Sequence, residues 1–173
     1  MRERTKNVTI ESTEYQIRRF SPAVGSFILG RVLSAGARAM RDAAERNGNQ
    51  DVQPPQEIKE FDPKDAEPAA RAMAVGAVLQ GGFSIEDHSL IQTECMKVCS
   101  RIEWNEKANL EMPMPLVNDK GQWAIKEVGE DVNTVLQLQV EAITFNFTDF
   151  FGQGGLMKLM GTQTPQELSS QKI

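Results

Sequence analysis

Few residues with metal-binding or catalytic side chains stand close together in this sequence. The only histidine, His88, lies seven positions before Cys95, and Cys99 follows one helical turn later. On a helix these three soft ligands would lie on about the same face and could approach one zinc ion. A structural zinc site needs four ligands, however, and buried cysteine often acts as a small hydrophobic residue. We therefore expect His88 in the core or at its rim, both cysteines in the core, and no bound metal.

Other short motifs also fail to define an active site. The glycine-rich stretches at 80–82 and 152–155 lack the strand, helix and lysine that phosphate-binding loops require. The acidic pairs at 86–87 and 130–131 fall in the first turns of expected helices, where negative charge complements the helix macrodipole. No nucleophile is paired with a base. The sequence therefore predicts no catalytic residue, no cofactor and no enzymatic activity.

Composition and charge indicate a soluble domain that does not bind nucleic acid. The chain has 173 residues, of which 40% are hydrophobic, and a net charge of −5. Residues 1–46 carry nine basic and five acidic side chains, whereas the rest carries ten and nineteen. Such asymmetry can steer a partner or favour head-to-tail self-association. Because two cysteines make no disulfide framework, and no signal peptide or membrane span is visible, we expect a reducing, cytosolic location.

The N-terminal segment predicts a β-hairpin followed by a helix. Apolar residues alternate with polar ones on both sides of the polar stretch 11–14. These apolar residues are Val8 and Ile10 before the stretch, and Tyr15 and Ile17 after it. Ser21 is a suitable N-cap, Pro22 suits the first helical position, and helical spacing continues to about residue 46.

Two further helices are predicted in the middle of the chain, after a proline-rich stretch at 48–64 that we interpret as a flexible loop. The first covers about 65–80 and stops at a pair of glycines. The second begins after Ser84, which would form a capping box with Asp87. Its expected apolar stripe consists of Ile85, Ile91, Cys95, Val98 and Ile102.

A small second hairpin and a last helix complete the expected fold. Residues 112–125 form two short extended runs around a turn at 118–121, and a helix covers about 130–151. We expect an α+β fold, mostly α, with an N-terminal β-hairpin, four helices and a small second hairpin before the last helix. A single domain would span 1–157, with a flexible tail at 158–173.

The last helix carries four of the eight phenylalanines and predicts two different faces. The core face, at 100° per residue, comprises Val132, Leu136, Val140, Ile143, Phe147 and Phe150, with Val135 and Phe151 at its margins. Leu138 and Phe145 lie nearly opposite, close to Glu141. Either another element covers them, such as a hairpin at 111–126, or they form a seam for a partner helix or a second copy. Leu138, Phe145 and Glu141 are therefore the candidate partner-binding residues.

Two segments resemble the phage tail assembly chaperones. VTIESTEYQIRRFSPAVGSFILGRVL, at 8–33, is similar to the opening of those proteins, which is a short hairpin followed by a helix with a Pro/Ala/Ser start. The end of the last helix is similar to their Asn-Phe-x-x-Phe-Phe pattern. The likeness covers roughly 7–46 and 84–152 and departs in the proline-rich middle and in a turn without glycine. The residues that carry the motifs are Tyr15, Asn146, Phe147, Asp149, Phe150 and Phe151.

The resemblance implies a non-enzymatic role in the host cell cytoplasm. Such chaperones coat the tape measure protein, help to recruit tail tube subunits and are absent from the finished virion. Membership would also suit a homo-oligomer that contacts neither nucleic acid nor membrane. The alternatives are a structural minor tail protein or adaptor retained in the virion, a small enzyme, and a DNA-binding regulator that uses the basic residues 1–46.

Overall fold

The structure is a computed structural model that describes residues 3–46, 66–79 and 83–152. The described part contains five helices and a four-stranded antiparallel sheet, which confirms the expected α+β class. The elements are β1 (Thr5–Ile10), β2 (Thr13–Arg18), α1 (Pro22–Arg46), α2 (Ala66–Leu79), α3 (Ile85–Lys97), β3 (Cys99–Asn105), β4 (Leu110–Pro115), α4 (Lys126–Glu130) and α5 (Val132–Gly152). The expected loop at 48–64 and tail at 158–173 lie outside the described residues.

The N-terminal hairpin has a tighter turn than the sequence indicated. Ile10 pairs with Thr13, so that only Glu11 and Ser12 connect β1 to β2. Both residues have positive φ, 48° and 69°, as a two-residue type I′ turn requires. Thr13 and Glu14 therefore belong to β2, and the hairpin forms without the glycine that such turns usually contain.

Serine side chains cap α1 and α3 as expected. Ser21 Oγ accepts a hydrogen bond from Val24 N at 3.4 Å, and Ser84 Oγ accepts one from Asp87 N at 3.1 Å. The carboxylate of Asp87 forms an ion pair with Arg31 on α1, with Oδ2 and Nη1 3.1 Å apart, which ties the two helices together.

The apolar stripe predicted for the third helix was wrong at both ends. Ile91 and Cys95 are fully buried, but Ile85 is exposed at the start of α3. The helix ends at Lys97, and Ile102 lies in β3. The prediction extended the helix too far because the apolar residues of a short strand, which alternate with a period of two, can by chance continue the 3.6-residue spacing of the preceding helix.

The sheet has the order β1-β2-β3-β4, so β3 joins the two hairpins. β2 pairs with β3 only over Tyr15–Ile17, whereas β4 pairs with β3 along the whole length of β4. The strands of the second hairpin were misplaced, because β4 pairs with β3. The predicted turn at 118–121 does form: Gly121 N donates to Asn118 O, and an isolated bridge joins Val117 to Trp123 across it. We call the β3–β4 hairpin, residues 99–115, the arm.

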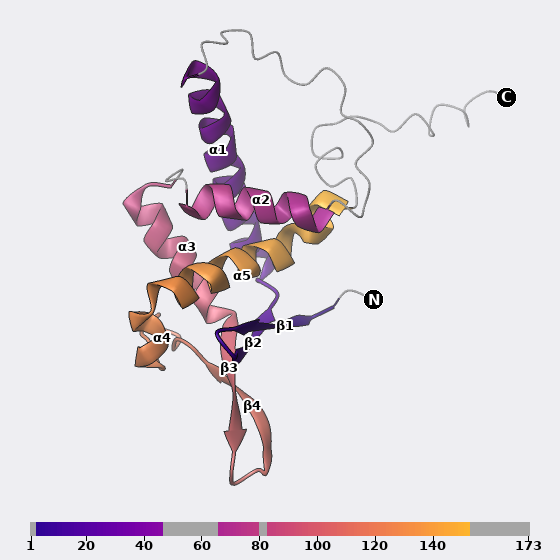
Figure 1. Cartoon of the computed structure of the whole chain (residues 1–173), viewed down its shortest axis with the longest axis vertical. Helices are drawn as coiled ribbons and strands as arrows, with labels where there is room; N and C mark the ends of the chain where they lie inside the picture. The colour runs from indigo at the N-terminus through magenta and orange to yellow at the C-terminus, as the bar shows by residue number, and fades with distance from the viewer. Residues whose placement is uncertain (1–2, 47–65, 80–82, 153–173) are drawn as a thin grey trace, which may run out of the picture.

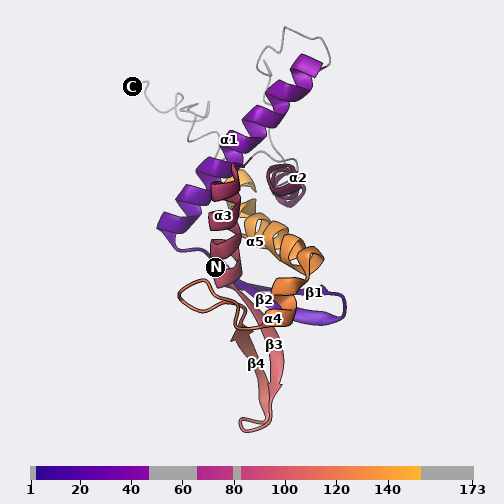
Figure 2. The same ribbon diagram turned by 90° about the vertical axis from the view of Figure 1, so that its left-hand side faces the viewer.

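α5 lies in the middle of the molecule, between α2 on one side and the sheet on the other (Figures 1 and 2). α3 and α4 also pack against it. The free end of α1 and the tip of the arm extend in opposite directions along the longest axis (Figure 1). Consequently, α5 forms the centre of the core, and the two extensions lie at its periphery.

Candidate interaction surface

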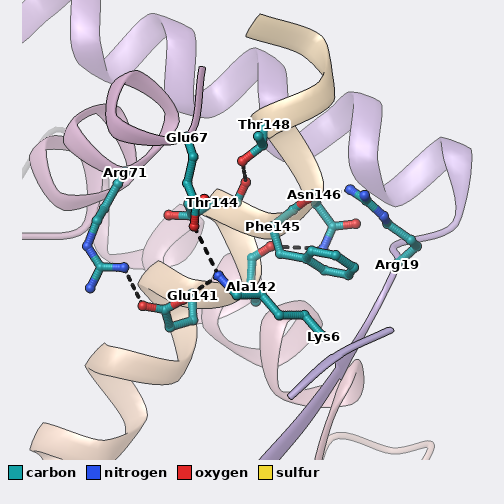
Figure 3. A network of polar contacts seen from close by, with 10 residues as sticks. All are labelled: Lys6, Arg19, Glu67, Arg71, Glu141, Ala142, Thr144, Phe145, Asn146 and Thr148. Carbon is teal, nitrogen blue, oxygen red and sulfur yellow. Dashed lines mark hydrogen bonds and ion pairs between the residues drawn. The ribbon is translucent and has the colours of Figure 1, made fainter. Parts of the chain in front are cut away.

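Leu138 and Phe145, for which the sequence left open either cover by another element or an exposed seam, are buried. Leu138 has 0% and Phe145 has 7% of its surface exposed, so the first alternative is the one found. α2 and β1 pack against this helix, and their Arg71 and Lys6 both form ion pairs with Glu141, which lies between these two residues in the sequence (Figure 3). Whether a partner binds at this helix stays a prediction.

Glu141 joins three elements through ion pairs. Its carboxylate forms ion pairs with Arg71 of α2 and with Lys6 of β1, whose Nζ lies 3.3 Å from Oε2 (Figure 3). The same Lys6 Nζ lies 3.2 Å from Oε1 of Glu67, also on α2. The Glu141 side chain is mostly buried, whereas Arg71 and Glu67 are exposed. Glu141 therefore fixes the packing of α2 on α5 and has little surface to offer a partner.

Asn146, a residue of the family motif, fastens the end of β2 to α5. Its Oδ1 accepts a hydrogen bond from Phe20 N at 2.7 Å, and its Nδ2 donates to the carbonyls of Ala142, at 2.8 Å, and Arg18, at 3.4 Å. Beside it, the Arg19 guanidinium lies over the Phe145 ring, 3.9 Å from the centroid, and donates to the Phe145 carbonyl (Figure 3). These contacts hold the segment between β2 and α1 against the central helix.

The remaining motif residues that the structure describes are part of the core. Tyr15 and Phe147 are buried, and burial raises the pKa of the Tyr15 hydroxyl. Phe147 lies 6.3 Å from the Phe20 ring, centroid to centroid, and Phe150 is partly buried against the core. The side chains of Asp149 and Phe151 lie outside the described residues. The motif therefore has a mainly structural role.

The candidate chemical groups give no reactive site. Cys95 and Cys99 are free and fully buried, and burial raises the pKa of both thiols, that of Cys99 to about 12. His88 is half-buried and lines a shallow depression of about 320 Å³ with Phe83 and Ile85. Within the described ranges no three His, Cys, Asp or Glu side chains could share a metal ion. Neutral thiols are poor nucleophiles and poor metal ligands.

Four of the eight large apolar side chains that are exposed among the described residues lie on the arm. Trp104 is 60% exposed, Leu110 49%, Met112 37% and Met114 43%. The strand register divides these four side chains between the two faces of the arm, with Trp104 on one face and the other three on the opposite face. Trp104 is paired with Glu111, whereas Leu110, Met112 and Met114 pair with Asn105, Glu103 and Arg101 on the other face. An apolar cluster on a projecting hairpin indicates an interaction surface.

The outer edge of the arm is closed to an additional strand. Leu116 N donates to Cys99 O at 3.2 Å, so the amides of the even-numbered residues of β4 point toward β3. Those of 111, 113 and 115 point outward, and two of these residues, Pro113 and Pro115, have no N–H. An additional strand would find only one amide donor among these three residues, which disfavours extension of the sheet and favours contact through side chains.

Sequence reasoning missed the arm. The signal was present, since Ile102 and Trp104 alternate with polar residues, as do Leu110 and Met112 with Glu111. Extending the helical stripe of α3 to Ile102 hid the first strand. Moreover, period-two alternation does not tell whether an apolar face is buried or exposed.

Within the described residues, no helix is both long enough and apolar enough to cross a membrane.

Comparisons with known proteins identify the family. Neither the curated proteins nor the solved structures gave a match. The family model described as phage tail assembly chaperone protein, TAC, matches residues 11–158, which is most of the chain. The resemblance in the two sequence motifs is thereby confirmed, and the chain belongs to the phage tail assembly chaperone family.

Proposed function

We propose that this chain binds the tape measure protein and helps to recruit tail tube subunits during tail assembly. It acts without catalysis in the host cytoplasm, works as a homo-oligomer and leaves before the virion is complete. Family membership supports a role in assembly. The observation that carries the proposed binding is the row of exposed apolar side chains on β4, because a chaperone must offer apolar surface to an aggregation-prone partner.

The β4 row suits an apolar helix. Leu110, Met112 and Met114 point to one face, and at about 3.4 Å per residue the row is about 14 Å long. Two turns of an α-helix rise about 11 Å, so two or three apolar side chains of a helix can contact the row. Methionine has several rotatable bonds and adapts to irregular surfaces, which suits a chaperone that meets many segments of one long partner.

The closed edge favours the same partner. Pro113 and Pro115 remove two of the three outward-facing amides of β4, so an extended segment gains few backbone hydrogen bonds there. A helix satisfies its own backbone and needs only side-chain contacts. Each contact would be small and weak. Many copies along a long helix would nevertheless bind by avidity and could leave one at a time.

Co-expression tests the proposal. The tape measure protein of the same phage is produced alone, with the wild-type chain, and with Met112→Asp, which puts a charge in the β4 row. We expect the wild-type chain to keep the tape measure protein soluble and the variant to lose most of this effect. Val132→Asp is the matched control, because Val132 is exposed but lies at the start of α5.

Two outcomes would contradict the proposal. Equal insolubility of the tape measure protein with and without the wild-type chain would exclude its role as partner. Equal rescue by Met112→Asp and Val132→Asp would exclude the β4 row. Mass spectrometry of purified virions tests the proposed departure, since a stoichiometric amount of the chain would identify a structural tail component.

A further inference from the structure

The other face of the arm carries an exposed ring beside an exposed carboxylate. Trp104 and Glu111 are directly opposite each other on β3 and β4, so their side chains project together. In the described part of the chain Glu111 forms no ion pair, and Trp104 is the most exposed aromatic residue. This face is separate from the β4 row and stays available when that row is occupied.

The exposed face of α1 is complementary to this ring and carboxylate. Ser26, Gly30 and Ser34 recur on successive turns and form a strip of small residues, and a Cβ added to Gly30 would meet no heavy atom within 4 Å. Arg38, one turn further on, is exposed and forms no ion pair within the described ranges. A large ring can approach such a strip closely, and an arginine at its end can pair with a carboxylate or stack on an indole.

We propose that the arm of one copy docks on α1 of a second copy, with Trp104 on the strip of small residues and Glu111 paired with Arg38. The charges of the two elements favour this occupant: residues 99–115 carry three acidic and two basic side chains, whereas residues 22–46 carry four basic and two acidic ones. The arm and the free end of α1 lie at opposite ends of the molecule (Figures 1 and 2). The contact joins two different surfaces and is therefore heterologous: copies join head to tail, and the assembly keeps a free arm at one end and a free α1 at the other.

Charge reversal tests this contact in the full chain. In sedimentation velocity, the wild-type sedimentation coefficient should rise with protein concentration and fall when salt is added. Arg38→Glu and Glu111→Arg should each stay monomeric, because both create a pair of like charges. An equimolar mixture of the two variants should associate again, since each contact between the two species then joins opposite charges.

Two control variants carry the same charge changes elsewhere. Arg4→Glu and Glu130→Arg alter exposed residues outside the contact and should associate like the wild type. Trp104→Ser should weaken association at least tenfold while the circular dichroism spectrum is unchanged.

The proposal fails if the wild-type chain is monomeric at every concentration, or if either charge variant associates normally. It also fails if the mixture of the two variants stays monomeric, because each contact between the two species restores a pair of opposite charges. Association of the mixture would also exclude misfolding as the reason why each variant alone is monomeric, since mixing does not correct misfolding. A Trp104→Ser variant that loses tape measure binding but not self-association would assign this face to that partner instead. Self-association is measured without the tape measure protein, so this result and that of the co-expression experiment are independent.

Discussion

Replacing Asn146 by alanine should weaken the attachment of the β2–α1 connection to α5. The substitution removes the acceptor of the Phe20 amide, at 2.7 Å, and the donor to the Arg18 and Ala142 carbonyls. The Phe20 bond is partly buried, so its N–H loses a partner without full access to water. Loss of such a bond, with the donor left unpaired, costs about 1–3 kcal/mol. Alanine returns about 0.6 kcal/mol through its higher helix propensity, which leaves a net loss of about 1–2 kcal/mol.

Urea denaturation followed by circular dichroism measures this loss. Asn133→Ala is the matched control, because it changes the same residue type in the same helix but removes only an exposed hydrogen bond to Glu11. With a typical dependence of 1–3 kcal/mol per molar urea, the midpoint for Asn146→Ala should lie about 1 M below that of the control. A difference in unfolding free energy below about 0.5 kcal/mol would refute the structural role given to the motif asparagine.

One further substitution, a thiol-labelling experiment and a pH titration test the core. Gly129→Ala should destabilise the chain by about 1–3 kcal/mol, because its Cβ would lie 2.6 Å from the Trp123 ring; an unchanged melting temperature would contradict this packing. Cys95 and Cys99 should not react with a thiol reagent at pH 8 until denaturant is added, and rapid native labelling would contradict their burial. The raised pKa of Cys99, about 12, stabilises the fold fully below the unfolded value near 9. That stabilisation should disappear as the pH rises from about 9 to 12, as pH-dependent urea titrations can measure.

The sequence predicted those elements whose signals are local. The hairpin around 11–14, the start of α1 at Pro22 and the cap at Ser84 depend on neighbouring residues, and the structure confirms all three. Tertiary arrangement was harder to predict. Helical geometry correctly placed Leu138 and Phe145 on the face of Glu141, but it could not show that α2 and β1 cover that face.

The interaction surface was missed for a related physical reason. A strand that projects from the core has the same alternation as one that is half-buried, so pattern alone would have placed Met112 and Met114 inside. Only the sheet order shows that β4 is the edge strand and that the far part of β3 extends beyond its pairing with β2. Exposure of the arm therefore depends on long-range contacts and not on the residues of the arm.

Hydrogen exchange of the chain in complex with the tape measure protein tests the proposed binding most directly. If the β4 row binds this partner, amides of the arm between residues 104 and 112 should exchange more slowly in the complex than in the free chain. Amides of α5 around Leu138 and Phe145, which are already buried, should change little. Unchanged exchange in the arm together with new protection or exposure along α5 would contradict the proposal. It would indicate that the partner binds at the last helix.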